Sequence, residues 1–179
     1  MKFFFPKCLV QLLVLIFLLG ISTTYSQDTS KGNSFGISAL VQDSQFDILF
    51  PIFLSESAVI APALGLIYAS EVGSDISLGL VGRFYLNNKV VRPFLGGRAG
   101  AIFFSPSSSD DDGGADPEST TDFLVGILAG GEYFLNESFS FGIEAQLNAT
   151  ISDENSSRFG NPGGTNINTG AAVFATVYF

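Results

Sequence analysis

The chain has 179 residues, of which 46% are hydrophobic, 17 are acidic, 8 are basic and none is histidine. This acidic balance disfavours nucleic acid as a partner, because such binding rests on neutralising phosphates with lysine and arginine. Without histidine, and with a single cysteine, the usual pairs of nucleophile and general base cannot be built, so we do not expect an enzyme.

The N-terminus has the three parts of a secretory signal peptide. Lys2 and Lys7 precede an apolar run at 8–21, and small polar residues follow at 22–26. A membrane anchor is the alternative, and the shortness of the apolar run argues against it. Cys8 lies in this segment, so we expect a mature chain without disulfide or thiol chemistry. The predicted organisation is a signal peptide at 1–26, a short N-terminal segment at 27–33 and one folded domain at 34–179.

The expected mature chain is both acidic and apolar. Loss of Lys2 and Lys7 leaves 6 basic against 17 acidic residues, a net charge of −11. The mean hydropathy of the whole chain is +0.38, yet no later stretch is long enough for a membrane helix. A chain of this kind crosses a membrane only as a closed β-barrel, because open sheet edges are not tolerated in lipid.

Residues 138–152 carry the clearest strand pattern. Odd positions from Phe139 to Ile151 are apolar, and even positions are polar or glycine, which is the alternation of a strand between two environments. The segment is long enough to cross a bilayer as a tilted strand, and its polar row suits a water-containing lumen. Similar segments predict eight strands, near 34–42, 46–54, 58–70, 75–86, 91–105, 121–135, 138–152 and 166–179.

The connections between these strands alternate between tight turns and loops. Turns are predicted at 55–57, 87–90 and 136–137, and loops at 43–45, 71–74, 106–120 and 153–165. We therefore predict an all-β fold, an eight-stranded antiparallel up-and-down transmembrane β-barrel with its turns in the periplasm. Pro51, Pro62 and Pro93 are unusual inside a sheet, so we expect bulges or earlier strand ends there.

Aromatic residues gather near both ends of the predicted strands. Two aromatic girdles at the membrane interfaces are typical of such barrels. The turn-side set is Phe50, Phe53, Phe84, Tyr85, Phe94, Tyr133, Phe134, Phe139, Tyr178 and Phe179, and the loop-side set is Phe46, Tyr68, Phe103 and Phe123.

The inward rows hold charged residues of both signs. Arg83, Arg98, Glu132 and Glu144 fall on the inward rows of four successive strands, which brings them near one another. Eight strands leave a lumen barely wide enough for side chains. We therefore expect this lumen charge cluster to pair and to plug the barrel.

The carboxylates on the inward rows leave one enzymatic alternative open, which is a hydrolase that works with carboxylates alone and without histidine. Asp47 and Asp122 would join the two glutamates of the lumen charge cluster in such a site. The interpretation we favour is structural, with these acids paired to inward arginines, Arg92 included, because buried charges need partners.

The most distinctive loop is acidic. Asp110, Asp111, Asp112 and Asp116 lie among serine and glycine, a composition that calcium can use but without the spacing of an EF-hand. A solvated loop is the simpler interpretation, so we predict no cofactor and treat calcium as a weak candidate ligand.

Several segments resemble a known family. The runs 82–87, 92–97 and 131–136 (Gly-Arg-Phe-Tyr-Leu-Asn, Arg-Pro-Phe-Leu-Gly-Gly and Gly-Glu-Tyr-Phe-Leu-Asn) are similar to the small OmpA/OmpX-like outer-membrane β-barrel proteins, closest to the stand-alone barrel domains of Bacteroidota. The last residues, 173–179, resemble the terminal strand that the barrel assembly machinery recognises, with Val177 and Phe179 as its signal. The resemblance implies export, insertion by that machinery and residence in outer-membrane lipid.

The sequence thus predicts a non-enzymatic outer-membrane barrel with a structural or surface-interaction role. Loops 106–120 and 153–165 would face extracellular partners. A narrow, porin-like pore for small solutes is the alternative. A soluble barrel with an apolar cavity has the opposite polarity and ranks last.

Overall fold

The computed structural model describes residues 35–42, 45–69, 73–106, 119–156 and 160–179. They form nine antiparallel strand segments in one sheet. The segments are β1 (Gly36–Gln42), β2 (Gln45–Leu49), β3 (Ile52–Phe53), β4 (Ala58–Ala69), β5 (Gly73–Tyr85), β6 (Val91–Pro106), β7 (Thr120–Asn136), β8 (Phe139–Ile151) and β9 (Thr165–Tyr178). Within this part of the chain, no helix is long and apolar enough to span a lipid bilayer.

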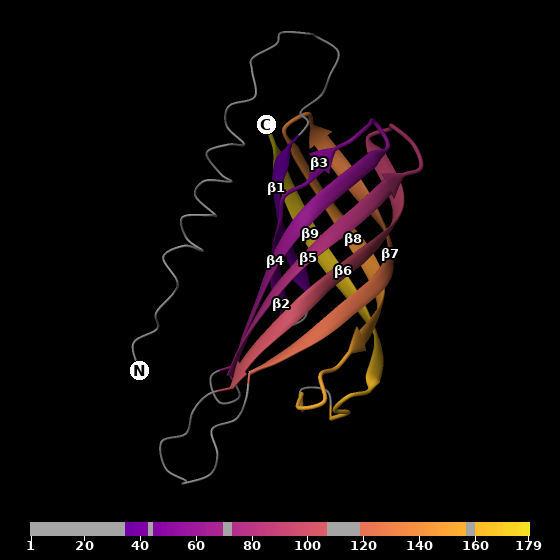
Figure 1. The fold of residues 1–179 in the computed structure, drawn as a ribbon. Helices are drawn as coiled ribbons and strands as arrows, with labels where there is room; N and C mark the ends of the chain where they lie inside the picture. Colours follow the sequence, from indigo (N-terminus) through magenta and orange to yellow (C-terminus); the bar gives the residue numbers. More distant parts are fainter. Residues whose placement is uncertain (1–34, 43–44, 70–72, 107–118, 157–159) are drawn as a thin grey trace, which may run out of the picture. The chain divides into compact units, whose positions relative to one another are not determined.

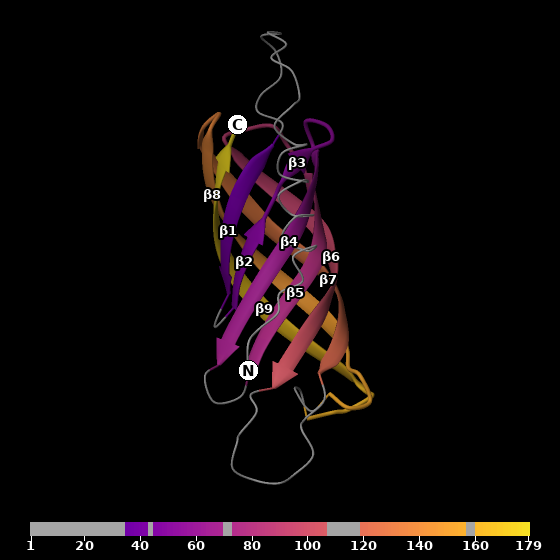
Figure 2. The same ribbon diagram turned by 60° about the vertical axis from the view of Figure 1, so that its left-hand side comes forward.

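The sheet closes on itself. Apart from β2 and β3, strands that follow one another in sequence pair with each other; β9 pairs with β1, and both β2 and β3 pair with β4. Leu49 faces Ala63 and Ile52 faces Ile60, so one unbroken register runs through β2 and β3. These two segments are one interrupted strand, and the predicted eight-stranded antiparallel barrel is confirmed (Figures 1 and 2).

Proline interrupts the second strand but not the others. Pro51 separates β2 from β3, whereas Pro62 and Pro93 lie inside β4 and β6 with continuous pairing. The carbonyl oxygen of Pro62 accepts from Phe50 at this interruption, and that of Pro93 accepts from Leu86 just after β5 ends. Their missing N–H groups fall where the ladder is already broken or finished, which is where a sheet tolerates proline.

The two faces of the wall differ in polarity as predicted. Along β8 every second residue is buried, from Ser140 through Glu144 to Thr150, while the residues between them are apolar and are exposed or, at Ala149, half-buried. Ile127 on β7 and Ile143 on β8 are each 65% exposed. The inside of the barrel is therefore polar over much of its length, and the outside is an apolar belt.

Half of the predicted turn-side girdle points inward, which corrects that prediction. These five aromatic residues are buried in the hydrophobic core of the lumen or packed against it, and the list is Phe53, Tyr85, Phe94, Phe134 and Tyr178. Their positions have the parity of the inward rows, and their rings fill the turn-side end of the lumen. Phe84, Tyr133, Phe139 and Phe179 are exposed at that end, as are Phe46, Phe103 and Phe123 toward the other.

Inward glycines make room for this packing. Gly142 faces Phe174 across β8 and β9, and Gly130 faces Phe94 across β6 and β7. A Cβ on Gly142 would lie 2.4 Å from the Phe174 ring, and one on Gly130 would lie 2.5 Å from the Phe94 ring. Each large ring thus lies over a glycine on the neighbouring strand.

Candidate functional site

The lumen contains a buried ion pair between Arg83 on β5 and Glu144 on β8. Nη2 of Arg83 donates to Oε2 of Glu144 at 2.7 Å, and the two side chains are 2% and 1% exposed. The Arg83 guanidinium also lies 4.9 Å from the ring centre of Phe94 and 4.2 Å from that of Phe174. Aromatic faces and a carboxylate together compensate the buried cation.

Glu132 on β7 is held by hydroxyl groups rather than by an arginine. Its carboxylate accepts from Tyr85 at 2.5 Å, from Tyr178 at 2.7 Å and from Ser140. The residue is fully buried, with 0% exposure. Because these donors come from β5, β8 and β9, this single carboxylate joins four strands across the turn-side end of the lumen.

Arg98 on β6 belongs to a third group of contacts, nearer the loops. Its Nη1 donates to Oε1 of Gln146 at 2.6 Å, and its Nη2 lies 3.7 Å from Oδ2 of Asp47. Gln146 in turn donates to Oε1 of Glu144 at 2.6 Å, and Gln45 donates to Oδ1 of Asp47 at 2.7 Å. A continuous polar chain therefore runs across the lumen from Arg83 to Gln45.

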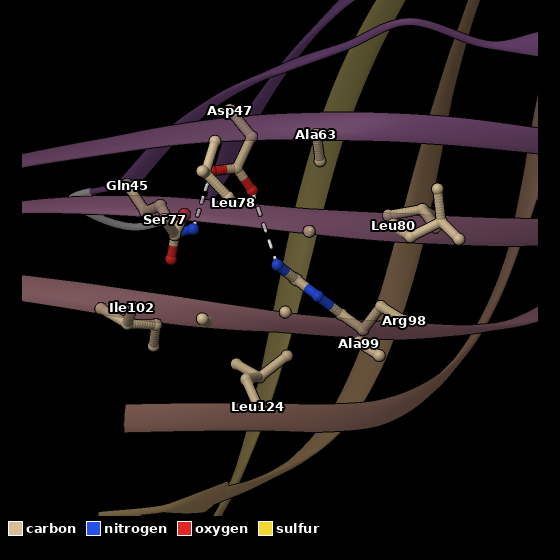
Figure 3. A pocket seen from close by; sticks show the side chains of 14 residues that line it. Gln45, Asp47, Ala63, Ser77, Leu78, Leu80, Arg98, Ala99, Ile102 and Leu124 are labelled. Carbon is tan, nitrogen blue, oxygen red and sulfur yellow. Dashed lines mark hydrogen bonds and ion pairs between the residues drawn. The ribbon is translucent and has the colours of Figure 1, made fainter. Parts of the chain in front are cut away.

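A small pocket lies beside Arg98 (Figure 3). Gln45, Asp47, Ser77, Arg98 and Ile102 are among the residues that line it. Its space for water is about 30 Å³, and one water molecule needs about 10–15 Å³ on this measure. The pocket thus has room for a few water molecules and no more.

Near the loop end of the barrel, the side chain of Asp122 holds part of the β8–β9 connection against the inner face of the wall. Oδ1 of Asp122 on β7 accepts from the backbone N–H of Asp153 at 2.9 Å, and Oδ2 accepts from Ser156 Oγ at 3.0 Å. Asp122 and Ser156 are each 1% exposed. Asp122 therefore ties the start of the β8–β9 connection to the inside of β7.

The four residues of the lumen charge cluster all point inward, but they do not all contact one another. Arg83 contacts Glu144 directly, Arg98 reaches this pair through Gln146, and Glu132 has hydroxyl partners. The hydroxyl donors and Gln146 are functional residues that the sequence reasoning missed. Gln146 was detectable, since it follows Glu144 by two positions on one face of a strand.

Other predicted residues lie apart from the lumen charge cluster. Arg92 stacks on Phe134, with its guanidinium carbon 4.2 Å from the ring centre, and donates to the backbone oxygen of Lys89 at 3.2 Å. Val177 and Phe179 are exposed on the outer face, where Phe179 stacks on Phe35 at 6.3 Å between ring centres. The weak calcium candidates at 110–112 and 116 lie outside the described residues, so that interpretation stays a prediction.

Comparison with known proteins gives a structural likeness. No protein-family model and no curated protein matches the chain. The N-terminal β-barrel domain of Pseudomonas aeruginosa OprF is similar over 83% of this chain and 100% of that domain, with a TM-score of 0.55 and 15% identity. Neisserial surface protein A is similar over 81% of this chain and 93% of that protein, with a TM-score of 0.55 and 16% identity. The chain thus has the fold of the small eight-stranded outer-membrane β-barrels, as its resemblance to that family implied.

Proposed function

We propose that this protein is an integral outer-membrane β-barrel without enzymatic activity, whose lumen is plugged by side chains. Its role is structural or one of surface interaction. The exported precursor loses residues 1–26, and the barrel assembly machinery inserts the mature chain with Val177 and Phe179 as its signal.

The observation that carries this proposal is the polarity of the wall. Exposed apolar residues surround the barrel on every strand, for example Leu78, Leu95, Ile127, Ile143 and Val173, whereas buried carboxylates and amides face inward. A soluble protein rarely exposes a contiguous apolar surface of this extent. A lipid bilayer accommodates it, because strands of a closed barrel leave no backbone group unpaired in lipid.

The contacts inside the barrel favour a plugged lumen over a pore. The Arg83–Glu144 pair and the Glu132 hydroxyl cluster are buried at the same end as the inward rings. The pocket between Gln45, Asp47 and Arg98 holds only a few water molecules. A solute would have to break the buried ion pair in order to pass.

The same contacts favour a structural role for the inward carboxylates. Asp47, Asp122, Glu132 and Glu144 each accept hydrogen bonds from side chains or backbone of the barrel itself. A carboxylate engaged in this way is not free to act as a general base, so we favour scaffolding over hydrolysis.

Conductance of the refolded mature protein in planar bilayers tests the plug. We expect negligible conductance for the wild type and a leak for Glu144→Ala, which leaves Arg83 without its carboxylate. Ile143→Ala is the matched control, because the neighbouring side chain points outward and leaves the lumen unchanged. A large and steady wild-type conductance would contradict the plug and favour the narrow pore.

A further inference from the structure

Two glycines face each other on the outer side of the barrel wall. Gly82 on β5 pairs with Gly97 on β6, and both have the parity of the outward rows. A Cβ on Gly82 would lie 4.0 Å from its nearest neighbour, the backbone oxygen of Gly97, and one on Gly97 would lie 3.4 Å from that of Gly126. Glycine weakens a strand relative to alanine. The inward glycines make room for rings, but among the described residues no side chain uses the space over this outward pair.

The glycine pair forms the floor of an open groove of about 360 Å³. We call it the glycine groove, and its outward lining is Ile60, Leu80, Gly82, Gly97, Ala99 and Val125. Arg98 and Gly126 also border the groove, but their inward parity means that they present main chain to it. The side chains of this lining therefore offer hydrocarbon contacts alone.

The glycine groove lies within the apolar belt, toward the turns. A strand tilted by about 40° advances roughly 2.5 Å per residue along the barrel axis. Gly82 is three residues from the end of β5, and Gly97 is six residues from the start of β6. These positions are roughly 8 and 15 Å from the turn-side ends of their strands. Each leaflet contributes about 15 Å of hydrocarbon, so lipid of the turn-side leaflet surrounds the groove in the proposed orientation.

Three features of the wall argue against a protein as the occupant. The main-chain groups of β4, β5, β6 and β7 are already paired with one another at this level, so an added strand has nothing to bind. A stable protein interface uses about 20–30 residues a side, whereas eight residues line the groove. Residues 27–34, which precede the barrel, read Gln-Asp-Thr-Ser-Lys-Gly-Asn-Ser and bring no apolar side chain to fill it.

We propose that the glycine groove binds one acyl chain of a phospholipid from the turn-side leaflet. The groove is continuous with the apolar belt that we assign to lipid. Within a bilayer, association depends on van der Waals packing, and small residues let a partner approach the backbone closely. An unfilled groove forfeits such contacts. Since an apolar cavity of about 150 Å³ holds one benzene molecule, this groove has room for a run of several methylene groups.

The inference rests on the outer-membrane location proposed above, and photolabelling separates the two. Refolded mature protein is placed in nanodiscs of dimyristoylphosphatidylcholine with a small fraction of phosphatidylcholine that carries a diazirine in its acyl chain. Labelling of Leu80, in the groove, is compared with labelling of Ile143, on the belt away from it. Leu80 is 45% and Ile143 is 65% exposed, so random contact with lipid predicts stronger labelling at Ile143.

The variants fill the groove or leave it open. Gly97→Leu and Gly82→Leu each place a side chain on its floor, where an added Cβ makes ordinary contact. Gly131→Leu is the matched control, because Gly131 is an outward glycine outside the groove lining whose Cβ would meet nothing within 4 Å. Heat-dependent gel migration confirms that each variant is an inserted barrel, and gel filtration reports its oligomeric state.

We expect Leu80 to be labelled about threefold or more above Ile143 in the wild type and in Gly131→Leu. In Gly97→Leu and Gly82→Leu this ratio should fall below one. A wild-type ratio at or below one, a ratio that the groove variants leave unchanged, or an equal loss in Gly131→Leu would each overturn the acyl-chain site. Self-association that Gly97→Leu abolishes would overturn it in favour of a second copy as the occupant. Failure to insert in a membrane would instead overturn the proposed function.

Discussion

At the scale of single residues, the buried carboxylates of Glu144 and Glu132 are stabilised by two different kinds of partner. Glu144 has a cationic partner, Arg83, at 2.7 Å. Glu132 instead accepts three hydroxyl hydrogen bonds. Both arrangements satisfy carboxylate oxygens that would otherwise be costly to bury, but they respond differently when one member is removed.

Removal of Glu144 should destabilise the barrel more than removal of the whole pair. Glu144→Ala leaves the Arg83 charge buried without its carboxylate, which costs about 3–5 kcal/mol, whereas an apolar pair of similar volume is often neutral or stabilising. We expect Arg83→Met with Glu144→Leu to restore the free energy of unfolding to near the wild-type value. Urea unfolding in lipid vesicles measures both, and a double variant as unstable as Glu144→Ala would contradict this view of the pair.

The hydroxyl cluster makes a second prediction at this scale. Tyr178→Phe removes one donor from a carboxylate that keeps two, at a cost of about 1.5–3 kcal/mol. Glu132→Ala leaves the hydroxyls of Tyr85, Tyr178 and Ser140 without their acceptor, so its cost should be clearly larger. The same unfolding assay compares the two, and equal losses would show that Glu132 is not the centre of the cluster.

At the scale of strands, glycine decides which large side chains fit inside. Gly142 lies under the Phe174 ring, whereas a Cβ on Gly131, the glycine of β7 that faces outward, meets nothing within 4 Å. Overpacking of a filled core costs about 1–3 kcal/mol. We expect Gly142→Ala to lower the unfolding free energy by that amount and Gly131→Ala to leave it unchanged or raise it.

A second substitution that makes room for the added methyl group is the control for Gly142→Ala. Phe174→Leu combined with Gly142→Ala should recover part of the loss, because the smaller side chain leaves room for the added methyl group. A Gly142→Ala variant as stable as Gly131→Ala would show that the ring moves freely and that the contact does not constrain the barrel.

The last strand makes a prediction about insertion. Phe179 is exposed on the outer face beside Phe35, at the end of β9 that closes the barrel. Deleting Phe179 should lower the amount of inserted barrel in cells far more than Ile151→Ala, which removes an exposed apolar side chain near the loop end. Quantification of the heat-modifiable form in membrane fractions provides the measurement. Equal insertion of the two variants would exclude Phe179 as the terminal signal.

At the scale of the whole molecule, the apolar belt makes the barrel dependent on an amphiphile. Detergent-extracted mature protein should have an antiparallel-sheet circular dichroism spectrum and should migrate differently on gels before and after heating, because the described strands pair with one another all round the barrel. A mainly helical spectrum would contradict both the fold and the membrane location.

The sequence determined the strands and the side of the wall on which each residue lies, because a side chain's face depends only on its parity along the strand. The alternation at 138–152 and the inward positions of Arg83, Arg98, Glu132 and Glu144 were readable for this reason. Parity alone also places Tyr85 and Tyr178 inside, although their clustering at strand ends suggested an outer girdle.

Only the tertiary structure decided which inward groups meet. Contacts across a lumen depend on register, tilt and the space left by glycines on neighbouring strands, and none of these is encoded within one strand. This is why the structure was needed to separate the Arg83–Glu144 pair from the hydroxyl cluster around Glu132.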